Sequence, residues 1–359
     1  MKLAAILFAT IAATAQVSLE RVPNGGIQPQ AAVDARGRIH LIYFSGDPQA
    51  GDVFYVRSGD GGEHFSAPLR VNSVPASAVA VGNIRGAHLA IGRNGRVHVA
   101  WAAPKGAGMM YTRLNDSETA FERERNVAST CPLDGGTVAA DAAGHVYVVW
   151  HAPGPEIKDE AHRRVWLARS DDDGVTFSPE RAVNDPGTGV CGCCGSAAVT
   201  GLDGTLFSLF RSATDTVHRD MYVLASHDGG QTFTSKKLDE WQVGYCVMSS
   251  AAMITAPTGT LAAWETRDQI RLGDPAGAIA TAPGEANKRK YPALAMDRNL
   301  NVLLAWTEGM GWKKGGSLAW QLYGRDLHPI GDVERAPGVP AWSLVAVVAR
   351  PGGGFVIFY

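Results

Sequence analysis

The chain has 359 residues, a formal net charge of −2 and only 19% charged residues. This composition excludes a highly charged disordered chain, and no basic run indicates nucleic acid binding. With 45% hydrophobic residues, 42 glycines and 19 prolines, the sequence indicates a substantial core built from short elements joined by many turns.

The first 15 residues have the pattern of a signal peptide. Lys2 precedes a short apolar stretch over 3–13, and Ala13-Thr14-Ala15 supplies the small residues of a cleavage site. The alternative is that this stretch is a strand or helix of the fold. We expect one mature domain over 16–359, exported to the periplasm or the cell exterior. No stretch is long and apolar enough for a membrane span.

Three segments share the pattern Ser-x-Asp-x-Gly-x-x-Phe, at 58–65, 170–177 and 226–233. The second and third start 56 positions apart, and the first and second start 112 apart, which is twice that period. A further copy is expected at 114–121, where an Asp and a Phe keep the register. This spacing indicates a repeat architecture.

The pattern has a structural explanation. An Asp carboxylate accepts backbone N–H groups across a tight turn, and Gly takes a positive φ that other residues resist. The Phe is expected to pack between neighbouring sheets. We therefore assign structural and not catalytic roles to Asp60, Asp172 and Asp228.

A second element recurs between these turns: a short strand, a turn, and a strand ending in an aromatic residue. The second strands of these hairpins are expected at 39–44, 97–101, 145–150, 205–210, 260–264, 301–306 and 355–359. Each unit then adds two more strands, as at 53–57 and 66–71 in the first. Four short strands in about 45 residues are typical of a propeller blade. The last hairpin lacks outer strands, so residues 17–22 are expected to pair with it and close the ring.

The sequence therefore predicts an all-β fold, a β-propeller of four-stranded blades. Seven blades are favoured by the hairpin count, with six as the alternative. The repeated turns are Asp-boxes, and with this blade pattern the chain resembles the sialidase superfamily of Asp-box (BNR) repeat proteins. The resemblance covers nearly the whole mature chain.

This resemblance implies an active site with three arginines for the substrate carboxylate, an Asp acid/base, and a Tyr nucleophile paired with a Glu. The Arg-Val-Pro at 21–23 is the nearest match to the family's N-terminal arginine motif, although it falls at the end of an outer strand. Other residues lie in loops or at strand ends where a catalytic site would form. These candidates are Arg85, Arg211, Arg289, Tyr291 and Glu265.

All five cysteines precede the innermost strands of consecutive blades. Cys131, Cys191 and Cys246 each lie ten positions before the hairpin turn of their blade, and Cys193 and Cys194 follow Cys191 closely. Propeller topology brings such connections to the face opposite the Asp-boxes, so the five are expected to converge. One interpretation is two disulfides and a free thiol. The other is a thiolate site for copper or zinc, with redox chemistry as a smaller alternative.

Two classes of function remain open from the sequence. The first is binding of a small molecule or glycan at the channel mouth, or glycoside hydrolysis there, including exo-sialidase activity. The second is metal binding or thiol chemistry at the cysteines. Loops on the same face supply further polar and aromatic groups, among them His151, Glu160 and Trp312. His88 is expected to face the channel or the core.

Overall fold

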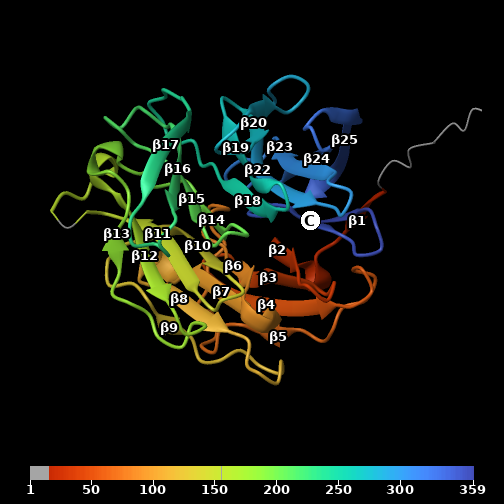
Figure 1. Cartoon of the computed structure of the whole chain (residues 1–359), viewed down its shortest axis with the longest axis horizontal. Coiled ribbons are helices and arrows are strands. Elements are labelled where there is room, and N and C mark those ends of the chain that lie inside the picture. The colour runs from red at the N-terminus through yellow and green to blue at the C-terminus, as the bar shows by residue number, and fades with distance from the viewer. Residues whose placement is uncertain (1–15, 155) are drawn as a thin grey trace, which may run out of the picture.

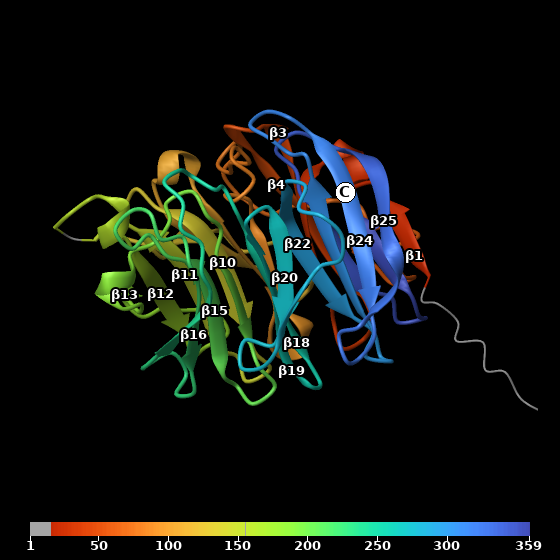
Figure 2. The ribbon, with the colours of Figure 1, turned by 90° about the horizontal axis from the view of Figure 1, so that it is seen from above.

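The computed structural model describes residues 16–154 and 156–359, which form seven β-sheets arranged in a ring (Figure 1). The chain is thus an all-β propeller with seven blades, as the hairpin count predicts. The expected signal peptide lies outside the described residues. In Figure 2 the ring is turned by 90°, and the strands run across its thickness from one face to the other.

Six blades have four strands, numbered outward from the central channel. Blade one consists of β2 (Ile27–Val33), β3 (Ile39–Asp47), β4 (Ala50–Ser58) and β5 (Leu69–Arg70). Blade two consists of β6 (His88–Ile91), β7 (Val97–Ala102), β8 (Met109–Arg113) and β9 (Arg125–Asn126). Blade three consists of β10 (Asp134–Ala140), β11 (Val146–Ala152), β12 (Arg164–Ser170) and β13 (Arg181–Ala182).

Blade four consists of β14 (Ala197–Thr200), β15 (Leu206–Arg211), β16 (Met221–Ser226) and β17 (Thr234–Asp239). Blade five consists of β18 (Ala251–Ala256), β19 (Gly259–Thr266), β20 (Gln269–Gly273) and β21 (Ile279–Thr281). Blade six consists of β22 (Arg289–Met296), β23 (Val302–Glu308), β24 (Gly316–Tyr323) and β25 (Pro329–Val339). All seven expected second strands of the hairpins are present, within a few residues of their predicted bounds.

The seventh blade differs, because its sheet has three strands: β26 (Ala346–Ala349), β27 (Phe355–Phe358) and β1 (Val17–Glu20). This agrees with the expectation that the last hairpin lacks outer strands of its own and is joined by the N-terminal strand. The closure itself is confirmed, since β1 pairs with β27 in parallel. The N-terminal strand occupies the edge that the last hairpin would otherwise expose.

Helical structure among the described residues is limited to five short 3-10 turns, and none of their helices is long or apolar enough to cross a membrane. The turns are η1 (Pro23–Gly25), η2 (Arg93–Gly95), η3 (Pro104–Gly106), η4 (Glu160–His162) and η5 (Pro186–Thr188).

The core lies between the blades. The second strand of each blade lies mostly buried and is rich in apolar residues, with a few buried polar side chains such as His40 and Glu265. Four of them end near a tryptophan that is at most 1% exposed: Trp101, Trp150, Trp264 and Trp306. Each hydrophobic cluster joins residues of neighbouring blades, for example Trp150 with Tyr111. Packing between blades therefore holds the ring together.

The Asp-box turns have the predicted geometry. In the second copy the Ser170 hydroxyl donates to Asp172 Oδ1 over 2.7 Å, and the same oxygen accepts the Thr176 amide over 2.8 Å. Gly174 has a φ of 82°, which an L-residue adopts only with strain. The aromatic residue packs against the next blade, where Phe177 makes an edge contact with Tyr111. The copies around Asp60 and Asp228 repeat these bonds.

The degenerate copy at 114–121 also folds as a turn, with an altered hydrogen-bond acceptor. Asn115 Oδ1 accepts the Thr119 amide over 2.9 Å, while Asp116 pairs with Arg96 instead. The acceptor has moved by one residue, and Phe121 still packs edge-on against Tyr55. The turn thus survives without the motif's Ser and Gly.

The blade topology separates two faces. The Asp-boxes and the turns between the first and second strands lie on one face. On the opposite face lie the connections between blades and the loops between second and third strands; we call this the mouth face. A cavity of about 940 Å³ runs along the central channel, lined by the innermost strands of all seven blades.

Candidate functional site

The mouth end of the channel is covered by the connection between blades one and two, residues 80–87. Ile84 from this segment packs in one hydrophobic cluster with Tyr291, Met310 and Val345 of blades six and seven. Ile84 also lies close to Gly195 in the connection that leads into blade four: a Cβ added to this glycine would be 3.5 Å from the Ile84 Cβ. Asn83 and Ile84 also line the channel cavity. Segment 80–87 therefore forms a cap, and a ligand on the mouth face must sit outside it.

Buried hydrogen bonds hold the cap in place. Gln28 Nε2 donates to the carbonyls of Ala80 and Trp342, over 2.6 and 2.7 Å. Asn83 Nδ2 donates to the Ser343 carbonyl. Both side chains are less than 5% exposed. The cap thus links the first two blades to the connection that leads into blade seven.

Arg85 and Trp312 flank the outer surface of the cap. A methyl group at Gly82 would lie 3.7 Å from Arg85 Nη1 and 3.9 Å from Trp312 Cζ3. Trp312 is 57% exposed and packs edge-on against Trp342, with the ring centroids 4.5 Å apart. Arg85 pairs with Asp134 through Nε and Nη2, and its Nη1 has no hydrogen-bond partner among the described residues. One exposed ring and one available donor therefore lie within 4 Å of the same point above Gly82.

The other two candidate arginines are committed to structural contacts. Arg211 is buried, lies over the Trp241 ring, and donates to the carbonyls of Arg219 and Glu265. Arg289 lies over the Trp306 ring and pairs with Glu308. Arg21, in the Arg-Val-Pro segment, lies over the aromatic ring of Tyr359 and donates to the carbonyl of Gly338 in β25, an outermost strand of the propeller. Among the described residues these arginines do not share a pocket.

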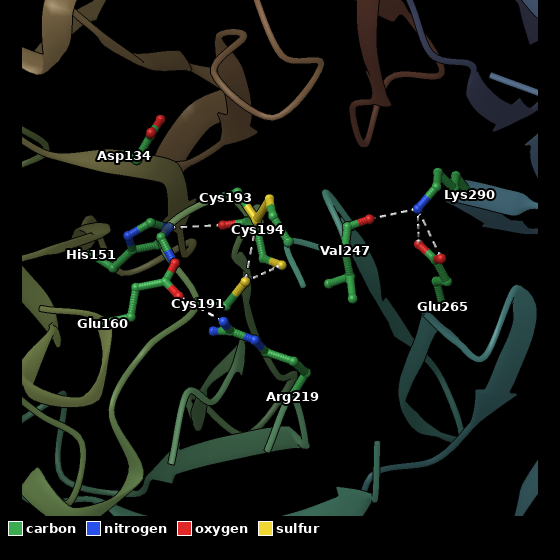
Figure 3. Close-up of a disulfide and its surroundings, with 12 residues drawn as sticks. Asp134, His151, Glu160, Cys191, Cys193, Cys194, Arg219, Val247, Glu265 and Lys290 are labelled. Carbon is green, nitrogen blue, oxygen red and sulfur yellow. Dashed lines mark hydrogen bonds and ion pairs between the residues drawn. A yellow bond between two sulfur atoms is a disulfide. The ribbon is translucent and has the colours of Figure 1, made fainter. Parts of the chain in front are cut away.

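Tyr291 and Glu265 are buried at the start of β22 and the end of β19. Lys290 Nζ lies 2.9 Å from Glu265 Oε1 and also donates to the Val247 carbonyl, as Figure 3 shows. Burial raises the pKa of Glu265, and Lys290 opposes this rise. Burial, with the nearby charge of Glu265, raises the pKa of Tyr291 above its usual range. The Tyr291 phenol therefore stays protonated at neutral pH.

Four of the five cysteines lie together in the connections that lead into blades four and five, and Figure 3 labels three of them, Cys191, Cys193 and Cys194. Cys193 forms a disulfide with Cys246, with the Cα atoms 6.4 Å apart. Cys191 and Cys194 are free thiols, 0% and 3% exposed, with their Sγ atoms 2.7 Å apart. The expected contact between neighbouring connections is present as a disulfide.

Cys131 does not take part in this cluster. It is a free, exposed thiol and lies outside the group of sulfurs at 191, 193 and 194. Partial burial and the nearby Glu180 carboxylate raise its pKa. The prediction that all five cysteines converge is therefore wrong for Cys131. Register counted from the hairpin turn is misleading here, because β10 carries a bulge between Asp134 and Thr137 and begins closer to the cysteine.

A polar network around the cysteines has no simple sequence signal. Glu160 accepts the Gly192 amide over 2.8 Å and pairs with Arg219 over 2.7 Å. His151 lies between the Cys194 carbonyl and an Arg163 nitrogen, and burial with the Arg163 charge lowers its pKa to about 4. These loop contacts join residues up to 59 positions apart, beyond what a local pattern predicts.

His88 faces the channel, as one of the two expectations had it, and lines the cavity. Burial lowers its pKa to about 4, so it is neutral at pH 7. We assign it no part in the site on the outer surface of the cap.

No protein-family model and no curated protein matches the sequence. Solved structures do match it. Trypanosoma rangeli sialidase has a TM-score of 0.53 at 12% identity, over 80% of this chain and 53% of that chain. A K499G mutant of NanB sialidase from Streptococcus pneumoniae has a TM-score of 0.49 at 10% identity, over 78% and 65%. An α-L-arabinanase from Penicillium chrysogenum, complexed with arabinobiose, has a TM-score of 0.49 at 14% identity, over 89% and 94%.

The first of these similarities concerns the fold: the chain is a seven-bladed β-propeller whose fold is similar to that of this sialidase. It spans less than two thirds of the length of both sialidases. At 12% identity the match describes the fold, and function has to be argued from the residues of this chain.

Proposed function

We propose that this protein binds a glycan on the mouth face, over the outer surface of the cap. Trp312 is the platform on which the apolar face of a sugar ring packs, and Arg85 is the polar anchor that orients its oxygens. The observation that carries the proposal is the exposed Trp312 ring beside the unpaired Arg85 Nη1. Trp and Arg are the residue types that most often dominate binding energy, and a few polar groups commonly fix a ligand's orientation.

The proposed activity is binding and not hydrolysis. A glycosidase of the usual kind needs one carboxyl group as acid and a second as base or nucleophile. Around the cap, Asp134 is held by Arg85, Glu160 by Arg219 and Glu265 by Lys290. A sialidase-like mechanism would need a Tyr291 phenolate, which burial and Glu265 disfavour. Export is part of the proposal, because residues 1–15 resemble a signal peptide and disulfides persist in oxidising compartments.

The test is binding of a panel of acidic and neutral glycans to wild type, Trp312→Ala and Leu202→Ala, measured by calorimetry. Leu202 is the control, since it is 78% exposed on the opposite face. We expect Trp312→Ala to weaken binding at least tenfold, because losing such an anchor costs about 2 kcal/mol. Leu202→Ala should bind as wild type does. Equal affinity of all three, or no bound glycan, contradicts the proposal.

A second measurement separates binding from hydrolysis. Wild type and Tyr291→Phe are incubated with chromogenic sialosides and arabinosides. We expect no turnover by either protein above the uncatalysed rate. Turnover by wild type that Tyr291→Phe abolishes would instead identify a glycosidase with a tyrosine nucleophile.

A further inference from the structure

Beyond glycan binding, the structure carries a second candidate activity in its cysteines. We propose that Cys191, Cys193, Cys194 and Cys246 form a disulfide relay, in which a buried dithiol passes two electrons through an exposed disulfide to an external disulfide. The substrate class is any disulfide, on a small molecule or on a protein, that reaches Cys246. The proposal does not depend on the glycan site.

The sulfurs form a path from the interior to the surface. Cys194 Sγ lies 2.7 Å from Cys191 Sγ, which lies 3.5 Å from Cys193 Sγ, and Cys193 is bonded to Cys246. Cys191 and Cys194 are buried, Cys193 is partly exposed, and Cys246 is exposed. Each sulfur therefore touches the next, and the last one is open to solvent.

The surroundings differentiate the two buried thiols. The hydrogen bond from Cys194 and the charges of Arg219 and Arg211 lower the pKa of Cys191. Burial, together with its contact to Cys191, raises the pKa of Cys194. A thiolate next to cations is the reactive form of cysteine. Cys191 is thus the nucleophile and Cys194 the resolving thiol, separated by two residues as in C-x-x-C motifs.

The same geometry argues against a copper or zinc site. A structural zinc site is usually held by four ligands. The third sulfur of the group at 191, 193 and 194 is already bonded to Cys246, so two free thiols remain in that group. This arrangement suits sulfur–sulfur exchange.

The internal exchange conserves electrons. The Cys191 thiolate attacks Cys193 Sγ, the Cys193–Cys246 bond breaks, and Cys246 leaves as a thiolate. Cys194 loses its proton and attacks Cys191 Sγ, the Cys191–Cys193 bond breaks, and Cys193 leaves as a thiolate. One disulfide has replaced another, and the single proton that Cys194 released can be taken up by one of the two thiolates of the exposed pair.

The external step transfers the electrons. The Cys246 thiolate attacks the external disulfide, whose first sulfur leaves as a thiolate, and Cys193 then resolves the mixed disulfide and releases the second. The external disulfide is reduced to two thiols, and the protein now holds two disulfides. An external dithiol restores the starting state by the reverse exchange.

The first experiment needs no variant. The protein is equilibrated in glutathione buffers from reducing to oxidising, trapped with N-ethylmaleimide in the folded and the unfolded state, and mapped by peptide mass spectrometry. We expect both the Cys193–Cys246 and the Cys191–Cys194 disulfide among molecules with one bond, and both bonds together in oxidising buffer. Finding only Cys193–Cys246 at every potential, or a stoichiometric metal ion retained on purification, would overturn the relay.

The second experiment measures reduction of oxidised glutathione and, separately, of insulin disulfides, with dithiothreitol as the recharging dithiol. Cys191→Ser should lower the rate at least tenfold, and Cys131→Ser, the control outside the cluster, should not change it. Activity on glutathione alone assigns a small-molecule substrate, and activity on insulin assigns a protein. Equal rates for both variants, with melting temperatures like wild type, would contradict the proposal.

Discussion

Val17 lies directly opposite Phe355 in the parallel pair that closes the ring, although 338 positions separate them in sequence. The pairing continues to Glu20 and Phe358, and Val17 and Leu19 pack against the core of blades six and seven. The chain's two ends thus complete one sheet.

Deleting residues 16–20 should lower the melting temperature and promote aggregation. The deletion removes the apolar contacts of Val17 and Leu19 and exposes the edge of β27, and unpaired edges recruit other strands. Calorimetry and light scattering would measure both effects. Deletion variants that melt like wild type and stay monomeric would show that the closure contributes little.

Replacing Asp172 with Ala should destabilise the protein by about 1–2 kcal/mol, because the Thr176 amide and the Ser170 hydroxyl lose their partner. Chemical denaturation would measure the change. The neighbouring Asp171, 64% exposed, is the control, and its replacement should change the free energy of unfolding much less. Glycan affinity should be unaltered, since the turn lies on the opposite face. An Asp172→Ala protein of normal stability but without affinity would refute the structural assignment.

Lys290→Met should cost about 3–5 kcal/mol, because it leaves the buried Glu265 carboxylate without a cation. Adding Glu265→Gln should restore much of this loss by removing the charge. Urea unfolding of the single and double variants would test the prediction. Glu240→Gln, at a pair whose carboxylate is 75% exposed, serves as the control and should cost under about 1 kcal/mol. A double variant less stable than Lys290→Met would contradict it.

Stability should fall as the pH drops from about 6.5 towards about 4. His151 Nδ1 accepts a hydrogen bond from Arg163, and His151 Nε2 donates one to the Cys194 carbonyl. Both bonds together require a neutral imidazole in the folded state. Its folded pKa of about 4 lies below the ordinary value of 6.5, so the unfolded chain binds the proton first and gains stability from it. Above pH 6.5 the contribution is constant.

The size of this effect is about 3 kcal/mol at most for one such histidine. Thermal melts from pH 7.5 to 4.5 would measure it. In His151→Gln the slope should become shallower without vanishing, because burial also lowers the pKa of His88 to about 4. His328→Gln, at a histidine whose side chain is 82% exposed, should keep the wild-type slope. A wild-type slope in His151→Gln would show that other groups are responsible.

Local turn chemistry explains why the fold could be predicted. The Asp-box turns at Asp60, Asp172 and Asp228 are determined by eight adjacent residues, and their period fixes the blade length. The same register brought the connections that carry Cys193 and Cys246 together, but it did not determine which cysteines form the disulfide. The register failed at Cys131, where a bulge in β10 changes how far the residue lies from its strand.

The site was less accessible to sequence reasoning. The cap depends on Ile84 meeting residues more than 200 positions away, and no periodicity encodes such a contact. The arginines at 211 and 289 have the right residue type and the right face, but each stacks on a tryptophan of its own neighbourhood. Residue type and topology place a side chain on a face, and packing decides whether it is available to a ligand.

The parallel closure also has a mechanical consequence. Because β1 and β27 run the same way, the chain enters this sheet at one end of the pair and leaves it at the other. A force that pulls the two termini apart therefore acts along the strands, and it loads the bonds between all four residue pairs together instead of peeling them one at a time. Opposite pulls on the two ends of this chain would therefore strain the ring in shear.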